Sequence, residues 1–86
     1  MKNLIILGIY VIDRIKESGR TQKLLSENAS IIRTRLGFHE VSETKCSRNG
    51  MIIIELKGTV ETNQALINKL NDIGGIVVKQ MVFNID

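Results

Sequence analysis

The chain has 86 residues, of which 43% are hydrophobic and 24% charged, and its formal net charge is +3 at pH 7. This length fits one small domain, residues 1–86, and the composition is typical of a globular chain. Aromatic residues make up only 3%, which removes the surface on which single-stranded nucleic acids stack. A single cysteine excludes an internal disulfide, and the apolar run after Met1 is too short to span a membrane, so we expect a cytoplasmic protein.

The first third of the chain predicts a strand followed by a helix. Residues 3–12 are almost continuously apolar and rich in β-branched side chains, which is typical of a central strand covered on both faces. Residues 14–30 are mostly polar with a short apolar stripe, as in an amphipathic helix. Gly19 weakens the first turn of this helix, so we expect the helix to begin only near Ser18 or Arg20.

The rest of the chain predicts two strands, a helix and a last strand. Residues 31–40 alternate apolar with polar side chains, and residues 51–57 are again rich in β-branched side chains, so both segments are expected to be strands. Thr59 is a good N-cap for a second helix, and the glycines at 74–75 are typical of its end. Residues 76–83 form the last predicted strand.

The predicted order of elements is therefore β-α-β-β-α-β. Because each βαβ crossover is right-handed, both helices are expected on the same face of a four-stranded antiparallel sheet. The sequence thus predicts an α+β, ferredoxin-like sandwich with the strand order 4-1-3-2.

The other face of this sheet carries no helix, and it is predicted to be apolar. One register of the strands places on it Ile6, Tyr10, Met51, Ile53, Val77, Met81 and Phe83. A patch of this size is larger than a soluble monomer normally exposes. We therefore expect a homo-oligomer, a dimer or a tetramer, in which these side chains form the interface. The alternative is a different strand register and a smaller patch.

Short patterns in the chain resemble a known family. They are the end of the first strand at residues 13–14, the leucines at 24–25, the Arg-Leu-Gly step at 35–37 and the glycine-containing stretch 70–77. With the β-α-β-β-α-β order, they resemble the ACT family of ligand-sensing regulatory domains and, more closely, the family of iron-only hydrogenase system regulators. The resemblance implies a stand-alone, ACT-like regulatory domain related to transcription that senses a small ligand near its subunit interfaces.

A second resemblance is to the C-terminal sensing domain of nickel-responsive repressors, carried by residues 54–58, the helix after them and residues 75–77. Those repressors bind nickel through histidines and a cysteine. Here only His39 falls at a ligand position, and Gly37 stands where a second histidine is expected. We therefore expect no metal site and no cofactor. A degenerate metal sensor that uses His39 and Cys46 across a subunit boundary is an alternative.

Two groups of residues are candidates for binding a small anionic ligand. They are Arg33, Arg35, Gly37 and His39 on the second strand, and Asp13 and Arg14 in the turn before the first helix. Two guanidinium groups on one side of a strand, with a glycine leaving space beside them, fit a carboxylate or phosphate, and a helix N-terminus attracts anions. The alternatives are that the arginines protect an edge strand or contact a subunit, and that Asp13 only caps the helix.

Enzymatic chemistry is not expected. The sequence offers no Ser-His-Asp set, no paired acids and no phosphate-cradling glycine loop before a helix. Neither predicted helix has the clustered Lys and Arg that major-groove recognition needs, so direct nucleic-acid binding is not expected either. The expected partners are a second copy of the chain, a small anionic ligand and a regulatory protein. The alternative function is that of a structural module, which binds another protein through its sheet and senses no ligand.

Overall fold

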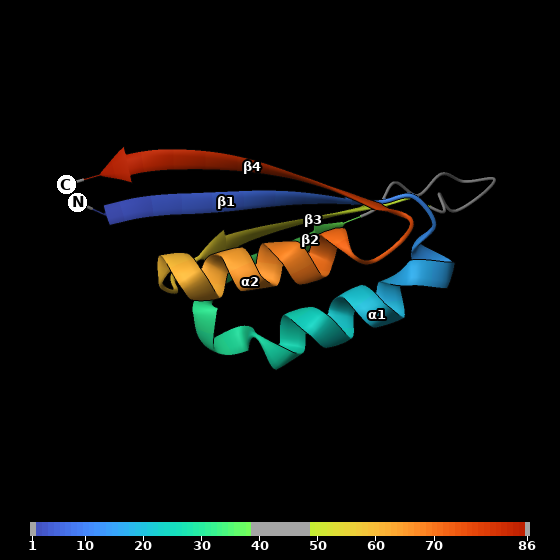
Figure 1. Ribbon diagram of the computed structural model, residues 1–86. Helices are drawn as coiled ribbons and strands as arrows, with labels where there is room; N and C mark the ends of the chain where they lie inside the picture. The colour runs from blue at the N-terminus through green and yellow to red at the C-terminus, as the bar shows by residue number, and fades with distance from the viewer. Residues whose placement is uncertain (1, 39–48, 86) are drawn as a thin grey trace.

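The four strands form one antiparallel sheet that carries both helices on one face (Figure 1). The computed structural model describes residues 2–38 and 49–85. Its elements are β1 (Lys2–Val11), α1 (Arg14–Glu27), a 3-10 turn (Ala29–Ile31), β2 (Ile32–Phe38), β3 (Gly50–Leu56), α2 (Val60–Asn71) and β4 (Ile76–Ile85). The strand order is β2-β3-β1-β4, so the predicted ferredoxin-like α+β fold and its strand order are confirmed.

An aliphatic core lies between the sheet and the helices. Its buried residues come from alternate positions of β1 and β3 and from one side of each helix, and are Leu7, Ile9, Val11, Leu25, Ile52, Ile54, Leu56, Leu66, Ile67 and Leu70. Because strand side chains alternate between faces, the residues between these on β1 and β3 lie on the opposite, helix-free face. We call this second face the open face.

The first helix begins earlier than the sequence predicts. It starts at Arg14 and runs through Gly19, so the expected start near Ser18 is wrong. The backbone N–H groups of Lys16 and Glu17 both donate to the carbonyl oxygen of Asp13, at 3.1 and 2.9 Å. The Asp13 carboxylate also accepts from the Lys16 N–H at 3.3 Å. These bonds satisfy the N–H groups of Lys16 and Glu17 in the first turn and offset the weak helix propensity of the glycine.

The start of α2 is fastened to the end of β3 by one side chain. The carboxamide of Asn63, which is only 5% exposed, accepts from the Gly58 N–H at 3.1 Å and donates to the Gly58 carbonyl at 3.2 Å. Thr59 caps the helix as predicted, since its hydroxyl accepts from the Thr62 N–H. A Cβ on Gly58 would lie 2.9 Å from Ile31, the residue before β2, so this connection is also packed against the start of that strand.

A second close contact stands at the start of β4. Gly75 has a φ of +82°, the left-handed conformation that glycine adopts without strain. A Cβ on it would lie 2.9 Å from Cγ of Glu17, a carboxylate side chain that is buried and paired with Arg20. The Gly75 carbonyl in turn accepts from the Ile12 N–H at 3.0 Å. These contacts fix the point where β4 enters the sheet.

At the opposite end of the sheet, β1 and β4 extend beyond β3. The pairing of β1 with β3 begins at Ile5, whereas its pairing with β4 begins at Lys2. Residues 2–4 and 83–85 therefore form a two-stranded ribbon, with the two chain ends side by side (Figure 1).

Candidate functional site

The open face carries every side chain predicted for the oligomer interface. The pairing of β1 with its two neighbours places Ile6 beside Met81, and Tyr10 beside both Met51 and Val77. Gly8 lies between Ile53 and Lys79, and Leu4 lies beside Phe83. Ile53 and Phe83 therefore belong to the same face as Ile6 and Tyr10. Paired residues of antiparallel strands point to the same side of the sheet. Whether these side chains form an interface stays a prediction.

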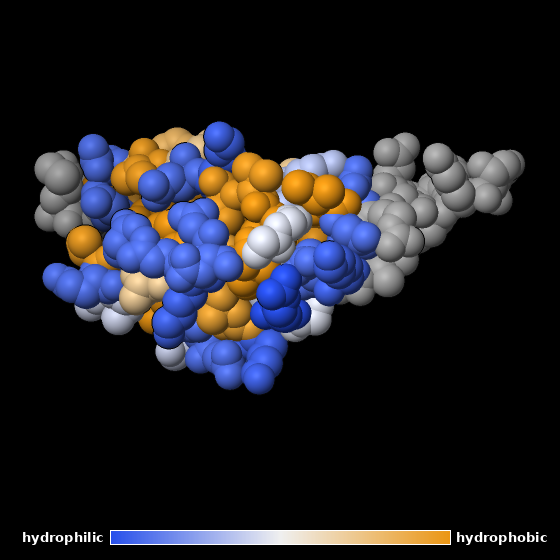
Figure 2. Space-filling model, turned by 45° about the vertical axis from the view of Figure 1, so that its right-hand side comes forward, coloured by the Kyte–Doolittle hydropathy of each residue, from blue (hydrophilic) through white to orange (hydrophobic). Residues whose placement is uncertain are grey.

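The structure adds apolar residues that the sequence analysis left out. Leu36 of β2 is paired with Ile53 and is 56% exposed, while Ile85 is paired with Lys2 and is 47% exposed. Apolar surface is visible along the upper part of the molecule, the side on which the sheet lies (Figure 2). The open face thus carries exposed apolar side chains from β2 across to β4, with the charged Glu55 and Lys79 between them.

A β-bulge interrupts the alternation of β2. Ile32 pairs with Leu56 and Thr34 with Glu55, so Arg33 is an extra residue opposite one position of β3. As a result Arg33 and Thr34 both reach Glu55 on the open face, at 3.4 Å from the Arg33 Nε and 3.2 Å from the Thr34 hydroxyl.

The bulge corrects one prediction about the ligand candidates. Arg35 follows it and pairs with the buried Ile54, which places Arg35 on the helix side of the sheet, away from Arg33. The expected pair of guanidinium groups on one side of the strand is therefore wrong. The sequence alternates without a break through this segment, but the extra residue shifts every later position to the other face.

The remaining candidates do not gather around Arg33. Asp13 follows the end of β1, whereas Arg33 lies beside Glu55, the partner of Ile6, so the two are separated by roughly 20 Å along the strand direction. Gly37 lies on the helix side opposite Ile52. His39, with Cys46, falls outside the described residues, as does the side chain of Arg14.

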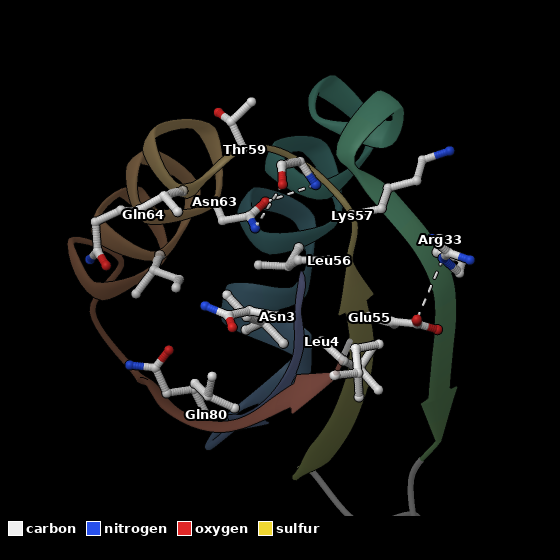
Figure 3. Close-up of a pocket in the computed structure, with 16 residues that line it drawn as sticks. Asn3, Leu4, Arg33, Glu55, Leu56, Lys57, Thr59, Asn63, Gln64 and Gln80 are labelled. Atoms are coloured by element: carbon white, nitrogen blue, oxygen red, sulfur yellow. Dashed lines mark hydrogen bonds and ion pairs between the residues drawn. The ribbon is translucent and has the colours of Figure 1, made fainter. Parts of the chain in front are cut away.

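A groove opens where β3 ends, between the β1–β4 ribbon and the first turns of α2 (Figure 3). Its volume is about 790 Å³, within the usual range for small-ligand sites. Carboxamides and aliphatic side chains from β1, β3, β4 and α2 line it: Asn3, Asn63, Gln64 and Gln80, with Ile5, Leu56, Ile67 and Val82. Four further lining residues belong to the open-face side of the sheet: Leu4, Ile85, Arg33 and Glu55.

The carboxamides that line this groove differ in whether they form hydrogen bonds within the protein. Asn63 is held by Gly58, and Gln64 donates to Asn68 at 2.9 Å. Among the residues that the structure describes, no hydrogen bond engages the carboxamides of Asn3 and Gln80, which lie around the hollow in Figure 3. Free carboxamides over an aliphatic floor offer both donors and acceptors to a partly apolar ligand. No local sequence signal indicates this site, because its walls come from five separate elements.

No group of three His, Cys, Asp or Glu side chains in residues 2–38 and 49–85 is placed to hold a metal ion. Neither described helix combines the length and the apolar character that a bilayer crossing requires.

Comparisons with known proteins give two informative structures. The uncharacterized protein TM1266 from Thermotoga maritima has a TM-score of 0.79 and 31% sequence identity, over 96% of this chain and 100% of that one. The de novo designed protein Foldit4 has a TM-score of 0.52 at 13% identity, over 99% of this chain and 100% of that one, and this likeness concerns the fold alone. No family model and no curated protein matches.

Proposed function

This chain belongs to the same family as the uncharacterized Thermotoga maritima protein, and we propose that it is a non-enzymatic regulatory domain that works as a homo-oligomer and binds a small ligand beside its subunit interface. The observation that carries the proposal is the apolar open face. The sequence resemblance to regulators of iron-only hydrogenase systems supports the regulatory role and a link to transcription.

The exposed apolar surface is large enough to drive self-association. Seven side chains of the open face are each 37–56% exposed, namely Tyr10, Leu36, Ile53, Val77, Met81, Phe83 and Ile85. Together they expose the equivalent of about three complete side chains. Covering them stabilises a complex by about 5–9 kcal/mol per copy, at about 1.5–3 kcal/mol per side chain. Two copies therefore gain an amount comparable to or above the about 4–15 kcal/mol cost of association.

A ligand bound in the groove would affect this association, because the groove borders the open face. Its inner wall lies on the helix side of the sheet, and its rim includes Leu4 and Ile85 of the open face. A second copy seated on that face would lie beside the groove, so a bound molecule would contact both copies. A ligand that binds one assembly state more tightly shifts the population toward that state. A partner protein would then recognise the assembly.

The first test is the oligomeric state of an Ile53→Glu variant. Ile53 lies on β3 in the middle of the open face and is 37% exposed, so a carboxylate is tolerated in a monomer but is buried unpaired in a complex. We expect the wild-type mass in sedimentation equilibrium to be a multiple of the monomer, and the variant to dissociate at least tenfold more readily. Val60→Glu is the matched control, because Val60 is 72% exposed on α2. A monomeric wild type at high micromolar concentration would remove the basis of the proposal.

The second test is ligand binding followed by thermal unfolding. We expect one member of a panel of phosphate, carboxylic acids and amino acids to raise the melting temperature in proportion to the logarithm of its excess over Kd. Gln80→Ala should weaken this shift, whereas Gln22→Ala, an exposed change on α1, should leave it unchanged. If no compound stabilises an oligomeric protein, it is a structural interaction module. If only a transition metal does so, it is a metal sensor.

A further inference from the structure

We propose that the outer edge of β4 pairs with β4 of a second copy, so that two sheets join into one continuous antiparallel sheet. This inference rests on the proposed self-association and adds a second contact to it. The first contact covers the open face, and the second uses the backbone at one edge of the sheet.

The outer edge of β4 is long and regular. β4 pairs with β1 over its full ten residues without a shift of register, and among the described residues no strand lies on its other side. Alternate N–H and C=O groups along this edge are therefore available to another strand. The chain contains no proline, and Lys79 is the only charged residue of β4. This edge lacks the features with which sheet proteins usually prevent pairing.

Apolar side chains are exposed on both sides of this edge. Met81 and Phe83, on the open face, are 56% and 47% exposed, and Val82, on the helix side, is 51% exposed. A strand added at this edge would cover side chains above and below the sheet together. Covering only the open face would leave Val82 in water.

A two-fold axis perpendicular to the sheet gives a pairing without charge conflict. With the axis at Met81, Lys79 of each copy lies opposite Phe83 of the other, and Gln80 lies opposite Val82. No like charges face each other, and the cation lies beside an aromatic ring, which is favourable. The same axis leaves both open faces on one side, so that they form one continuous apolar surface.

The size of the edge sets the expected assembly. Ten residues at about 3.4 Å each make an edge of about 34 Å. We expect one such strand to cover less than the about 800 Å² per partner of a stable interface. The edge contact is therefore expected to form together with the contact between open faces. Each copy then makes two different two-fold contacts, one through its β4 edge and one through its open face. Copies joined in this way form a closed tetramer.

The experiment combines the mass of the wild-type protein with amide exchange along β4. Neighbouring residues of a strand point their N–H groups to opposite sides, so a free edge exchanges at alternate positions and a paired edge is protected throughout. We expect a tetramer in which β4 is protected at consecutive positions. A dimer protected only at alternate positions overturns the edge pairing and leaves the face contact intact. A dimer with continuous protection supports the edge and refutes the face contact. A monomer overturns both.

A double variant separates the edge from the face. Gln80→Lys with Val82→Lys places four lysines around the proposed axis, on the helix side of the sheet, and spares the open face. We expect a dimer with alternate exchange in β4. Gln22→Lys with Ser26→Lys carries the same charge change on exposed positions of α1, away from the groove, and should remain tetrameric. An edge variant with the mass and the β4 protection of the wild type overturns the proposal.

Discussion

The two edges of the sheet are built in opposite ways. β2 has seven residues, a bulge, two arginines and an ion pair between Arg33 and Glu55, whereas β4 has ten residues in unbroken register and a single lysine. Bulges and charges are the usual means by which a sheet edge avoids adding another strand. The comparison indicates that β2 ends the sheet, while β4 presents a surface on which another strand can pair.

Each edge strand also has its own anchor, and the two anchors differ in kind. β4 is preceded by a left-handed glycine packed on a buried carboxylate, at Gly75 and Glu17. β2 is preceded by Ile31, which packs against Gly58 where Asn63 holds the neighbouring connection by two hydrogen bonds. Substitutions at the anchors should therefore destabilise the fold more than substitutions on the edges themselves.

The largest effect is expected at the β4 anchor. Gly75→Ala forces a Cβ into a left-handed backbone, which costs about 1–3 kcal/mol, and pushes it to within 2.9 Å of Glu17. We expect the free energy of unfolding in urea to fall by at least about 2 kcal/mol. Gly74→Ala is the control, since nothing lies within 4 Å of its Cβ position. Equal losses for the two variants would show that this anchor has no special role.

A somewhat smaller effect is expected at the β2 anchor. Asn63→Ala removes both bonds to Gly58 and leaves backbone groups without partners in a part-buried connection, so we expect a loss of about 1–3 kcal/mol in urea unfolding. Asn68→Ala, on the exposed side of the same helix, should change stability by no more than about 0.5 kcal/mol. Alanine is a better helix former than asparagine, so helix propensity cannot account for a loss in either variant. An Asn68 variant as unstable as the Asn63 variant would contradict a special role for the bonds to Gly58.

The smallest effect is expected on the β2 edge itself. The Arg33 side chain is 64% exposed, so Arg33→Ala should lower stability by less than about 1 kcal/mol, and salt should reduce the difference further. A double-mutant cycle with Glu55→Gln isolates the ion pair. A coupling energy well above this value would mean that the pair holds the bulge in place.

The sequence predicted the fold because the pattern of apolar residues in each segment agrees with the strand or helix that the segment forms. The continuous apolar run of β1 indicated a central strand, and its alternate positions assigned Ile6 and Tyr10 to the open face, where the structure places them. The start of α1 was misjudged because the propensity of Gly19 was weighed without the bonds to Asp13. Local propensity is a weak signal when backbone groups at a helix end have good partners.

The candidate site was less predictable for a physical reason. The bulge at Arg33 lies opposite Glu55, which is distant in the sequence, and the β2 sequence by itself shows an unbroken alternation. The groove likewise brings Asn3, Gln64 and Gln80 together from three elements. Single polar residues in strands and helices are ordinary, so nothing in their local sequence marks them as neighbours.

The ribbon formed by residues 2–4 and 83–85 has a thermodynamic consequence of its own. Two strands without a third neighbour are marginally stable in water, so we expect this end of the molecule to open and close without unfolding of the core. A molecule in the groove, or a second copy on the ribbon, would favour the closed form, and either one would leave less conformational entropy for the other to remove. Cooperativity between the two could thus arise from restricted motion, with no change in the average positions of the atoms.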